Sequence, residues 1–324
     1  MQEDLSKHQS AFKSLRRDKS HKAYGIAPHK PLMLLSLLQA ISNKIYTSSK
    51  IYITPELVAL FKTNWSLLVI SNHECRFALP FYYLTGDKFW QLHPKQGFES
   101  ILQLKSSMRS FANLNAAIEY AFVDDALFKL MQDEKSNSIL QQILLDEYFS
   151  ETKNNFTNSL ENQMNLFDNI EGKILQEDAA EYRVEITKLI QQKNEEEIFL
   201  RGSLFKREIP KIYNNTCCIS GMRIDSTINV SMIDACHIVP FSESYDDTVT
   251  NGIALCPNLH RAFDRGLISI GENYEVIVKS IFSEKLSLSY FIGPLNGQRI
   301  SLPVNNKHSP SLENFSHHRK RFNF

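Results

Sequence analysis

The segment from Cys217 to Gly266 constrains the fold and the chemistry of this chain most strongly. It contains three elements in a fixed order: a strand-like stretch at residues 234–240, a turn at Asn251 followed by apolar residues, and a helix-like stretch that begins at Pro257. β-Branched residues favour the strand, and proline suits the first position of a helix. We therefore expect the polar side chains of a strand, a turn and a helix to meet in this segment.

Histidine and carboxylate side chains in this segment are spaced for metal-assisted hydrolysis. His260 and Asp264 are four residues apart, so on a helix they share one face and can bind the same cation. His237 ends the strand-like stretch shortly before Pro240, and a neutral imidazole held there is suited to remove a proton from water. A metal ion beside it can polarise a phosphate and stabilise the departing oxygen.

Simpler explanations remain open for some of these residues. Asp264 could form an ion pair with a neighbouring arginine instead of binding a metal. Asn251 could belong only to a turn, or its amide could bridge backbone groups and hold the histidine-bearing strand against the helix. The acidic pair Asp246-Asp247 is typical of a solvent-exposed loop.

This segment resembles the HNH endonucleases. The resemblance rests on ACHIVPFSES, NGIALC and LHRAFDRGLISI, and it covers about Phe205 to Ile270. It implies a ββα-metal core that hydrolyses nucleic-acid phosphodiesters with a divalent cation, commonly Mg²⁺, with Mn²⁺ or another divalent ion as the alternative. It also implies that His237 is the general base, that Asn251 orders the loop and that His260 is a metal ligand. Asp264 falls where some members have another ligand.

One departure from that pattern concerns the metal. Many members have an aspartate or histidine directly before the first histidine as a metal ligand, and this chain has Cys236 there. A hard Mg²⁺ ion prefers oxygen to a thiol. Asp234 could supply the missing metal ligand, but on an ideal strand it points away from His237, so a bulge would be needed.

A second departure concerns zinc. Many relatives have two C-x-x-C knuckles around the core. Here the corresponding stretches begin at Cys218 and Cys256, and both lack the second cysteine. Two thiolates do not close a tetrahedral site, so we expect no structural zinc and interpret the two cysteines as small buried hydrophobic residues.

Residues 1–150 have the pattern of a mixed α/β module. HKPLMLLSLLQAI is too apolar for a surface helix and predicts a buried helix entered through Pro28. Thr54 can cap another helix. RFALPFYYL and FWQLHP, on either side of a turn at residues 85–88, predict a β-hairpin. Residues 114–149 have a helical pattern.

This first module is similar to that of predicted HNH restriction endonucleases with an N-terminal modified-DNA-binding module. The similarity rests on APHKPLMLLSLL, ALPFYYLTGDKFWQL, LLDEYF and FKREIPKIYNNTCCISG. In some relatives the module binds phosphorothioate DNA. Sulfur is larger and less hydrated than the phosphate oxygen it replaces, so a pocket of proline and aromatic residues beside a cation can prefer it. The DNA-contacting candidates are His29, Arg76, Pro80 and Phe81, although the aromatic residues could instead form the core of the hairpin.

The formal net charge of the 324 residues is zero, but it is unevenly distributed. Residues 1–118 carry a net charge of +8, residues 119–200 carry −11 and residues 201–324 carry +3. Nucleic-acid-binding proteins usually have excess positive charge, and the zero total conceals two basic modules separated by an acidic one. The tail SHHRKRFNF, with Arg319 and Lys320, resembles a basic phosphate-contacting extension, although it could be a disordered terminus.

We therefore expect an α+β chain in three parts. Residues 1–150 form a DNA-recognition domain, residues 151–200 an acidic and partly helical linker, and residues 201–324 the nuclease domain with its basic tail. Within the linker, residues 153–165 have the composition of a flexible connection.

The whole-chain properties favour a cytoplasmic protein. No apolar run is long enough to span a membrane, and the N-terminus lacks the apolar region of a secretory signal. Five cysteines, an odd number, are typical of reduced thiols rather than of a disulfide framework.

The sequence as a whole predicts a metal-dependent DNA endonuclease of restriction or defence type, directed to phosphorothioated or methylated double-stranded DNA. One core cuts one strand, so we expect a homodimer. The alternative is a DNA-binding regulatory or signalling-gated defence protein with a degenerate core, which the missing metal ligand before His237 favours.

Overall fold

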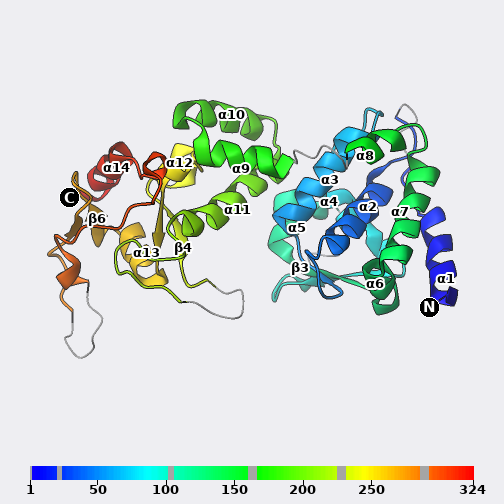
Figure 1. Ribbon diagram of the computed structural model, residues 1–324, viewed down its shortest axis with the longest axis horizontal. Coiled ribbons are helices and arrows are strands. Elements are labelled where there is room, and N and C mark those ends of the chain that lie inside the picture. Colours follow the sequence, from blue (N-terminus) through cyan, green and yellow to red (C-terminus); the bar gives the residue numbers. More distant parts are fainter. Residues whose placement is uncertain (1, 20–23, 101–105, 160–165, 225–230, 285–291) are drawn as a thin grey trace. The chain divides into compact units, whose positions relative to one another are not determined.

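The computed structural model describes the chain except for residues 1, 20–23, 101–105, 160–165, 225–230 and 285–291. The chain divides into two compact units, Met1–Asn169 and Ile170–Phe324, here called the N-terminal and C-terminal units and described separately (Figure 1). Both combine helices with small antiparallel sheets, so the predicted α+β class is confirmed.

The N-terminal unit is built around helix α2 (His29–Ser42), which is buried from its first residue to Ile41. The helix starts directly after Pro28, as predicted. The other helices of this unit up to residue 150 are α1 (Gln2–Lys13), α3 (Pro55–Leu68), α4 (Ala78–Tyr83), α5 (Phe111–Ala117), α6 (Asp125–Gln132) and α7 (Glu134–Tyr148). Helices α3, α4, α6 and α7 pack against α2, which explains its complete burial. Thr54 caps α3 as predicted, accepting a hydrogen bond from the Leu57 N–H at 3.3 Å.

The sheet of this unit corrects the predicted hairpin. Its strands are β1 (Lys50–Ile51), β2 (Trp90–Pro94) and β3 (Ile118–Val123), in the order β1-β3-β2. Only FWQLHP forms a strand, and it pairs with β3 rather than with the segment before it. The preceding ALPFYY is helix α4, which buries Ala78, Phe81 and Tyr82. These positions recur at helical spacing, and a proline is tolerated in a helix's first turn.

The continuous helix predicted at residues 114–149 is also wrong. Strand β3 interrupts it, and helices α6 and α7 follow. The run IEYAFV is rich in β-branched and aromatic residues, and its antiparallel pairing with both β1 and β2 outweighs the helical pattern around it.

The described part of residues 151–200 contains three complete helices and the start of a fourth. Helix α8 (Lys153–Ser159) occupies the start of the predicted flexible connection and packs against α3, and residues 160–165 lie outside the described residues. The boundary between the two units falls within α9 (Leu166–Gln176). Helix α10 (Ala179–Gln191) packs against α11 (Glu195–Ile212) in the C-terminal unit. Buried side chains from Ile170 onward therefore place most of the predicted linker inside that unit.

A two-stranded ribbon forms the centre of the C-terminal unit. Strand β4 (Asp234–His237) pairs antiparallel with β5 (Gly252–Leu255), so that His237 lies opposite Gly252 and Cys236 opposite Ile253. Helices α11 and α13 (Pro257–Asp264) both pack against the ribbon. The remaining elements are α12 (Phe241–Ser244), β6 (Ile268–Ile270), β7 (Val276–Val278) and α14 (Leu312–Phe322), with β6 and β7 paired antiparallel.

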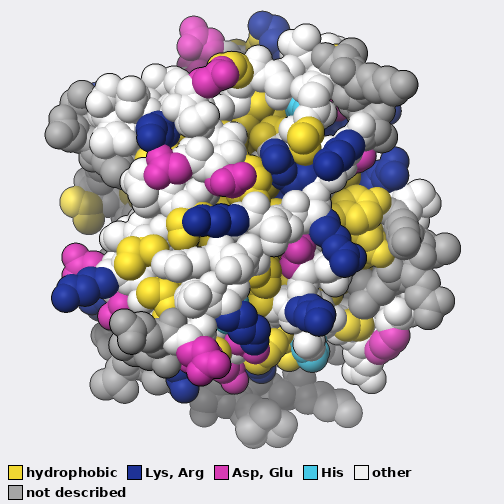
Figure 2. Space-filling view, turned by 90° about the vertical axis from the view of Figure 1, so that its right-hand side faces the viewer, with side chains coloured by type: hydrophobic (Ala, Val, Ile, Leu, Met, Phe, Trp, Pro, Cys, Tyr) yellow, Lys and Arg dark blue, Asp and Glu magenta, His cyan; other side chains and the backbone are white. Residues whose placement is uncertain are grey.

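The face of the N-terminal unit shown in Figure 2 mixes Lys and Arg with Asp and Glu around hydrophobic side chains. The positive charge of the first module is therefore not spread as one uniform patch over that face. Among the described residues, no helix is both long and apolar enough to cross a membrane.

Candidate active site

His237, the last residue of β4, is held between a buried carboxylate and an aromatic ring. Its Nε2 donates a hydrogen bond to Asp247 Oδ1 at 2.8 Å. Phe205 of α11 stacks on the imidazole, with ring centroids 3.8 Å apart and planes inclined by 9°. The side chain is 22% exposed, and within the described part of the chain Nδ1 has no hydrogen-bond partner. The ring is thus fixed with Nδ1 as the nitrogen that can accept a proton.

The loop that supplies Asp247 is buried, which corrects the expectation of a solvent-exposed acidic pair. Asp246 is fully buried and Asp247 is 2% exposed. Asp246 accepts hydrogen bonds from the Thr248 N–H and hydroxyl at 2.9 and 2.7 Å, and it pairs with Arg183 at 3.4 Å. Burial nevertheless raises the pKa of Asp246. Asp247 is a candidate functional residue that sequence reasoning missed.

Asn251 is fully buried and joins the parts of this site. Its Oδ1 accepts from the Val239 N–H at 3.0 Å, and its Nδ2 donates to the carbonyls of Val239 and Asp246, both at 2.9 Å. Asn314 of α14 donates to the same Oδ1 at 3.1 Å. The amide therefore bridges backbone groups and ties the end of β4 to the Asp246-Asp247 loop and to α14, not to the helix that carries His260.

A second group of polar atoms lies where β4 meets α13. Cys236, His260 and Asp264 each offer one potential ligand atom, and these atoms lie within 4.8 Å of one another. The separation is 3.9 Å from Cys236 Sγ to Asp264 Oδ1 and 3.5 Å from His260 Nε2 to Asp264 Oδ2. The structure thus brings the predicted pair His260 and Asp264 together, and it adds Cys236.

Asp234 lies beside this group without being one of its three members. Its Oδ2 is 3.1 Å from His260 Nδ1. A carboxylate bound to one nitrogen of a histidine orients the ring and leaves the other nitrogen free for a metal. Asp234 shares the side of β4 with Cys236, and the ladder from Asp234 to His237 has no bulge.

The chemistry of this donor set fits a divalent cation. An imidazole nitrogen together with a carboxylate oxygen can bind such an ion. The third donor, a thiol, fits Mg²⁺ poorly because Mg²⁺ binds oxygen ligands. Burial and the nearby carboxylate of Asp264 raise the pKa of the Cys236 thiol in the metal-free protein.

The other cysteines of the C-terminal unit form a separate buried group. Cys217, Cys218 and Cys256 are at most 2% exposed, which agrees with their interpretation as small buried residues. Cys217 Sγ accepts a hydrogen bond from the Ser220 N–H at 3.4 Å. A hydrogen bond from Cys256 lowers the pKa of Cys217 to about 5.

The basic tail is helix α14, and it packs into the C-terminal unit. Arg319 donates to the Ile270 carbonyl at 2.6 Å and its side chain is only 15% exposed, so it is largely engaged within the protein. Lys320 is exposed. Of the two predicted DNA-contacting residues of the tail, only Lys320 presents its charge to solvent.

His318 of α14 should make stability depend on pH. Burial lowers its pKa from 6.5 to about 4. The unfolded chain therefore binds a proton between these values and the folded chain does not, so the free energy of unfolding falls as pH drops from 6.5 to 4, by roughly 3 kcal/mol at most. Urea titrations at several pH values should show a smaller decrease for His318→Gln than for the unaltered protein. Equal pH dependence in both would contradict this assignment.

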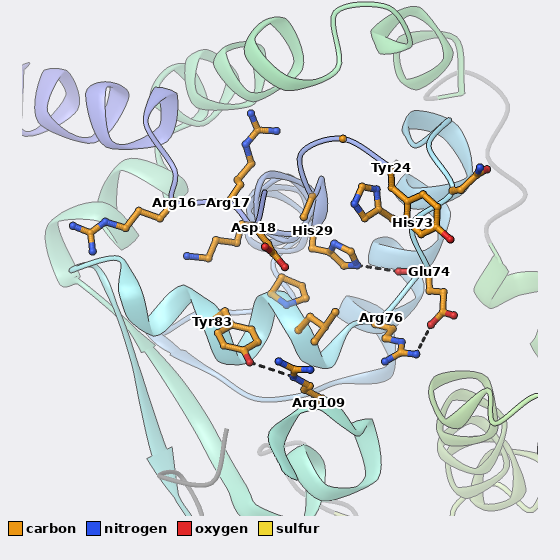
Figure 3. Close-up of a pocket in the computed structure, with 16 residues that line it drawn as sticks. Arg16, Arg17, Asp18, Tyr24, His29, His73, Glu74, Arg76, Tyr83 and Arg109 are labelled. Carbon is orange, nitrogen blue, oxygen red and sulfur yellow. Dashed lines mark hydrogen bonds and ion pairs between the residues drawn. The ribbon is translucent and has the colours of Figure 1, made fainter. Parts of the chain in front are cut away.

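A cavity of about 710 Å³ in the N-terminal unit gathers three of the four residues of the first module that were predicted to contact DNA (Figure 3). His29, Arg76 and Pro80 line it. Phe81 does not: it is fully buried, with its ring centroid 5.2 Å from that of Trp90, because α4 turns it into the core. The expectation that Phe81 contacts DNA is therefore corrected.

The lining of this cavity is predominantly basic, and Arg109 is the basic residue in it that nothing in the sequence singled out. Figure 3 shows arginines from separate segments surrounding Asp18 and His29. The basic residues are Arg16, Arg17, Lys30, Arg76 and Arg109, against the acidic Asp18 and Glu74. Tyr24 and Tyr83 add aromatic surface.

His29 adds no positive charge to the cavity near neutral pH. Burial lowers its pKa to about 4, and its Nε2 donates to the Glu74 carbonyl at 2.9 Å. Arg76 forms an ion pair with Glu74, and its side chain remains half-exposed. The cavity therefore combines a neutral histidine and a proline with several cations.

Comparisons with known proteins give a family match within the C-terminal unit. Residues 217–271 match the family model described as HNH endonuclease. No curated protein matches the chain. Among solved structures, one described as "Modification dependent TagI restriction endonuclease" is 20% identical, with a TM-score of 0.26. That match covers 36% of each chain, so this chain spans well under half of that structure. Residues 217–271, which contain the ribbon β4–β5 and helix α13, are an HNH endonuclease domain.

Proposed function

We propose that this protein is a metal-dependent DNA endonuclease of restriction type in which His237 acts as the general base. The observation that carries this proposal is the fixed imidazole of His237, bound to buried Asp247 and stacked on Phe205, in the residue that directly follows Cys236 of the metal-ligand cluster Cys236, His260 and Asp264. A proton acceptor beside metal ligands is the combination that phosphodiester hydrolysis requires.

The proton acceptor is His237 Nδ1. Asp247 holds the proton on Nε2, so Nδ1 keeps its lone pair and removes a proton from the attacking water. The positive charge that the ring then gains is stabilised by the Asp247 carboxylate. His237 directly follows Cys236 at the end of β4, and the phosphodiester is proposed to bind at this end of the strand, where it can reach both the imidazole and the Cys236 cluster.

His260 and Asp264, together with Cys236, are the residues that would hold the cation. When bound, the cation would polarise the phosphate and neutralise charge on the departing oxygen. Asp234 orients the His260 ring, and Asn251 fixes the end of β4 against the loop that carries Asp247.

Replacing Asp247 with asparagine should slow cleavage roughly 10²-fold or more, because the amide neither fixes the histidine tautomer nor stabilises the imidazolium. The pH profile of the cleavage rate should change as well, which a purely structural defect would not cause. Glu243→Gln, on the exposed end of α12, serves as the control and should cleave normally. An unaltered rate and pH profile in Asp247→Asn would exclude this role.

The cavity of the N-terminal unit is proposed to bind the DNA backbone, with a preference for phosphorothioated or methylated DNA. Five basic side chains line the cavity, of which Lys30 is paired with Asp87 and Arg76 with Glu74. The remaining arginines favour a phosphate, and Pro80, Tyr24 and Tyr83 provide surface for a larger, less hydrated sulfur. A neutral, buried His29 suits a poorly hydrated group better than a charged histidine would. A charged imidazole binds water strongly, and the incoming group would have to displace that water.

Digestion of unmodified, methylated, hydroxymethylated and phosphorothioated DNA tests this preference, and equal cutting of all four would exclude it. In a binding assay, Arg76→Gln should lower the magnitude of the salt-dependence slope by about 1. Lys135→Gln, exposed on α7 away from the cavity, is the matched control and should leave the slope unchanged. No change with Arg76→Gln would remove this residue from the interface.

Cleavage of both strands of double-stranded DNA needs two cores or two visits by one core, and we propose the homodimer as the simpler arrangement, which sedimentation analysis can test. A DNA-binding regulatory or signalling-gated defence protein with an inactive core is the second candidate. The presence of Cys236 in place of an oxygen or nitrogen ligand favours it. Calorimetry that detected no binding of any divalent cation would support this second candidate.

A further inference from the structure

The metal-ligand cluster has a composition that selects among cations. Its three potential ligand atoms are a sulfur, an imidazole nitrogen and a carboxylate oxygen. Thiolate and imidazole are ligands of Zn²⁺ and of similar transition metals, whereas Mg²⁺ takes oxygen ligands in near-octahedral geometry and loses its water reluctantly.

The backbone fixes Cys236 in this cluster. The residue is fully buried in β4 and its main chain pairs with Ile253. Its Sγ faces α13, 3.9 Å from Asp264 Oδ1. A cation bound between His260 and Asp264 would therefore contact the Cys236 sulfur, because the side chain of residue 236 has no oxygen atom.

The surroundings of His260 support metal binding through its other nitrogen. Asp234 Oδ2 binds Nδ1 at 3.1 Å, so Nε2 is directed to Asp264, whose Oδ2 is 3.5 Å away. This carboxylate–histidine arrangement recurs at zinc sites, where it fixes the ring and increases its strength as a ligand.

We infer that Cys236, His260 and Asp264 bind a borderline-soft divalent cation of the Zn²⁺ or Co²⁺ class, with Cys236 as a thiolate ligand, in preference to Mg²⁺. On binding, the Cys236 S–H bond breaks, a metal–sulfur bond forms and the proton passes to the buffer. This inference rests on the proposed function for the role of the ion, but it concerns which ion the site selects.

The test uses the full chain without DNA. Co²⁺ added to the apoprotein should produce a thiolate-to-cobalt charge-transfer band in the near ultraviolet, and Zn²⁺ should abolish it by displacement. A thousandfold excess of Mg²⁺ should not displace the cobalt. Cys236→Ser should lose the band and bind Zn²⁺ at least about 10-fold more weakly, while Cys75→Ser, a thiol in the N-terminal unit, should behave as the unaltered protein.

Cys236→Asp provides the reciprocal measurement, since an oxygen ligand at this position should raise the affinity for Mg²⁺. Cobalt binding without the charge-transfer band, or equal affinities for Mg²⁺ and Zn²⁺, would overturn the inference. Both results are measured on the unaltered protein, so they do not depend on the folding of a variant. Mg²⁺-supported cleavage without the band would overturn this inference and leave the proposed function standing. A cobalt band in a protein that cleaves no DNA would uphold the inference and overturn the proposed function.

Discussion

Replacing His237 with alanine should slow DNA cleavage by roughly 10²- to 10⁴-fold, the range that a positioned general base contributes. The substitution removes the imidazole between Asp247 and Phe205, and it leaves Cys236, His260 and Asp264 in place. Single-turnover cleavage at saturating cation measures the chemical step. Binding of the cation and of DNA should remain within about twofold of the unaltered protein, because neither depends on His237 Nδ1.

The matched control is His317→Ala, which removes an exposed histidine from α14 in the same unit. It should cleave normally. If His237→Ala cleaves as fast as this control, His237 is not the base, and the role assigned to Asp247 fails with it.

Replacing Asn251 with alanine should lower the free energy of unfolding of the C-terminal unit by about 3–5 kcal/mol. The substitution leaves the Val239 N–H and the Asp246 C=O without their side-chain partner, while the Val239 C=O keeps a hydrogen bond from the Ser244 hydroxyl at 3.3 Å. Each buried polar group left unsatisfied costs about 1–3 kcal/mol. This is the largest stability effect expected from a single polar residue of the site.

Asn251→Asp keeps an oxygen for the Val239 N–H but replaces both donors with a buried carboxylate oxygen that faces the carbonyls of Val239 and Asp246, so its stability should be no higher than that of Asn251→Ala. Asn258→Ala, exposed on α13, is the control and should change stability by less than about 0.5 kcal/mol. Urea unfolding measures all three, and a loss below about 1 kcal/mol for Asn251→Ala would contradict its role in joining β4, the loop and α14.

The local sequence pattern correctly predicted the helices that begin at a proline or a capping residue or that are apolar along their whole length. Pro28 and Thr54 mark the starts of α2 and α3, and Pro257 marks that of α13. The elements that were predicted wrongly depend on pairing with strands that are distant in the sequence. Strand β2 pairs with β3 rather than with the residues before it, and no local pattern reveals that choice.

The site was predictable where its residues lie close together in the sequence. His260 and Asp264 share one helix face, so their spacing alone brings them together. Asp247 and Phe205 were missed because they reach His237 through the fold: a buried loop supplies one and α11 the other. The only sequence signal for Asp247 was an acidic pair ten residues after His237, and solvent exposure is the usual state of such a pair.

Cation-dependent cleavage by the purified full chain is the most direct test of the proposed metal-dependent endonuclease activity. The protein is stripped with EDTA and incubated with unmodified and phosphorothioated supercoiled plasmid, and Mg²⁺, Mn²⁺, Co²⁺ or Zn²⁺ is then returned. A metal-dependent endonuclease should not nick either plasmid after EDTA treatment, and at least one of these ions should restore nicking. Nicking that persists in EDTA, or no nicking of either plasmid with any of the four ions, would contradict the proposed activity.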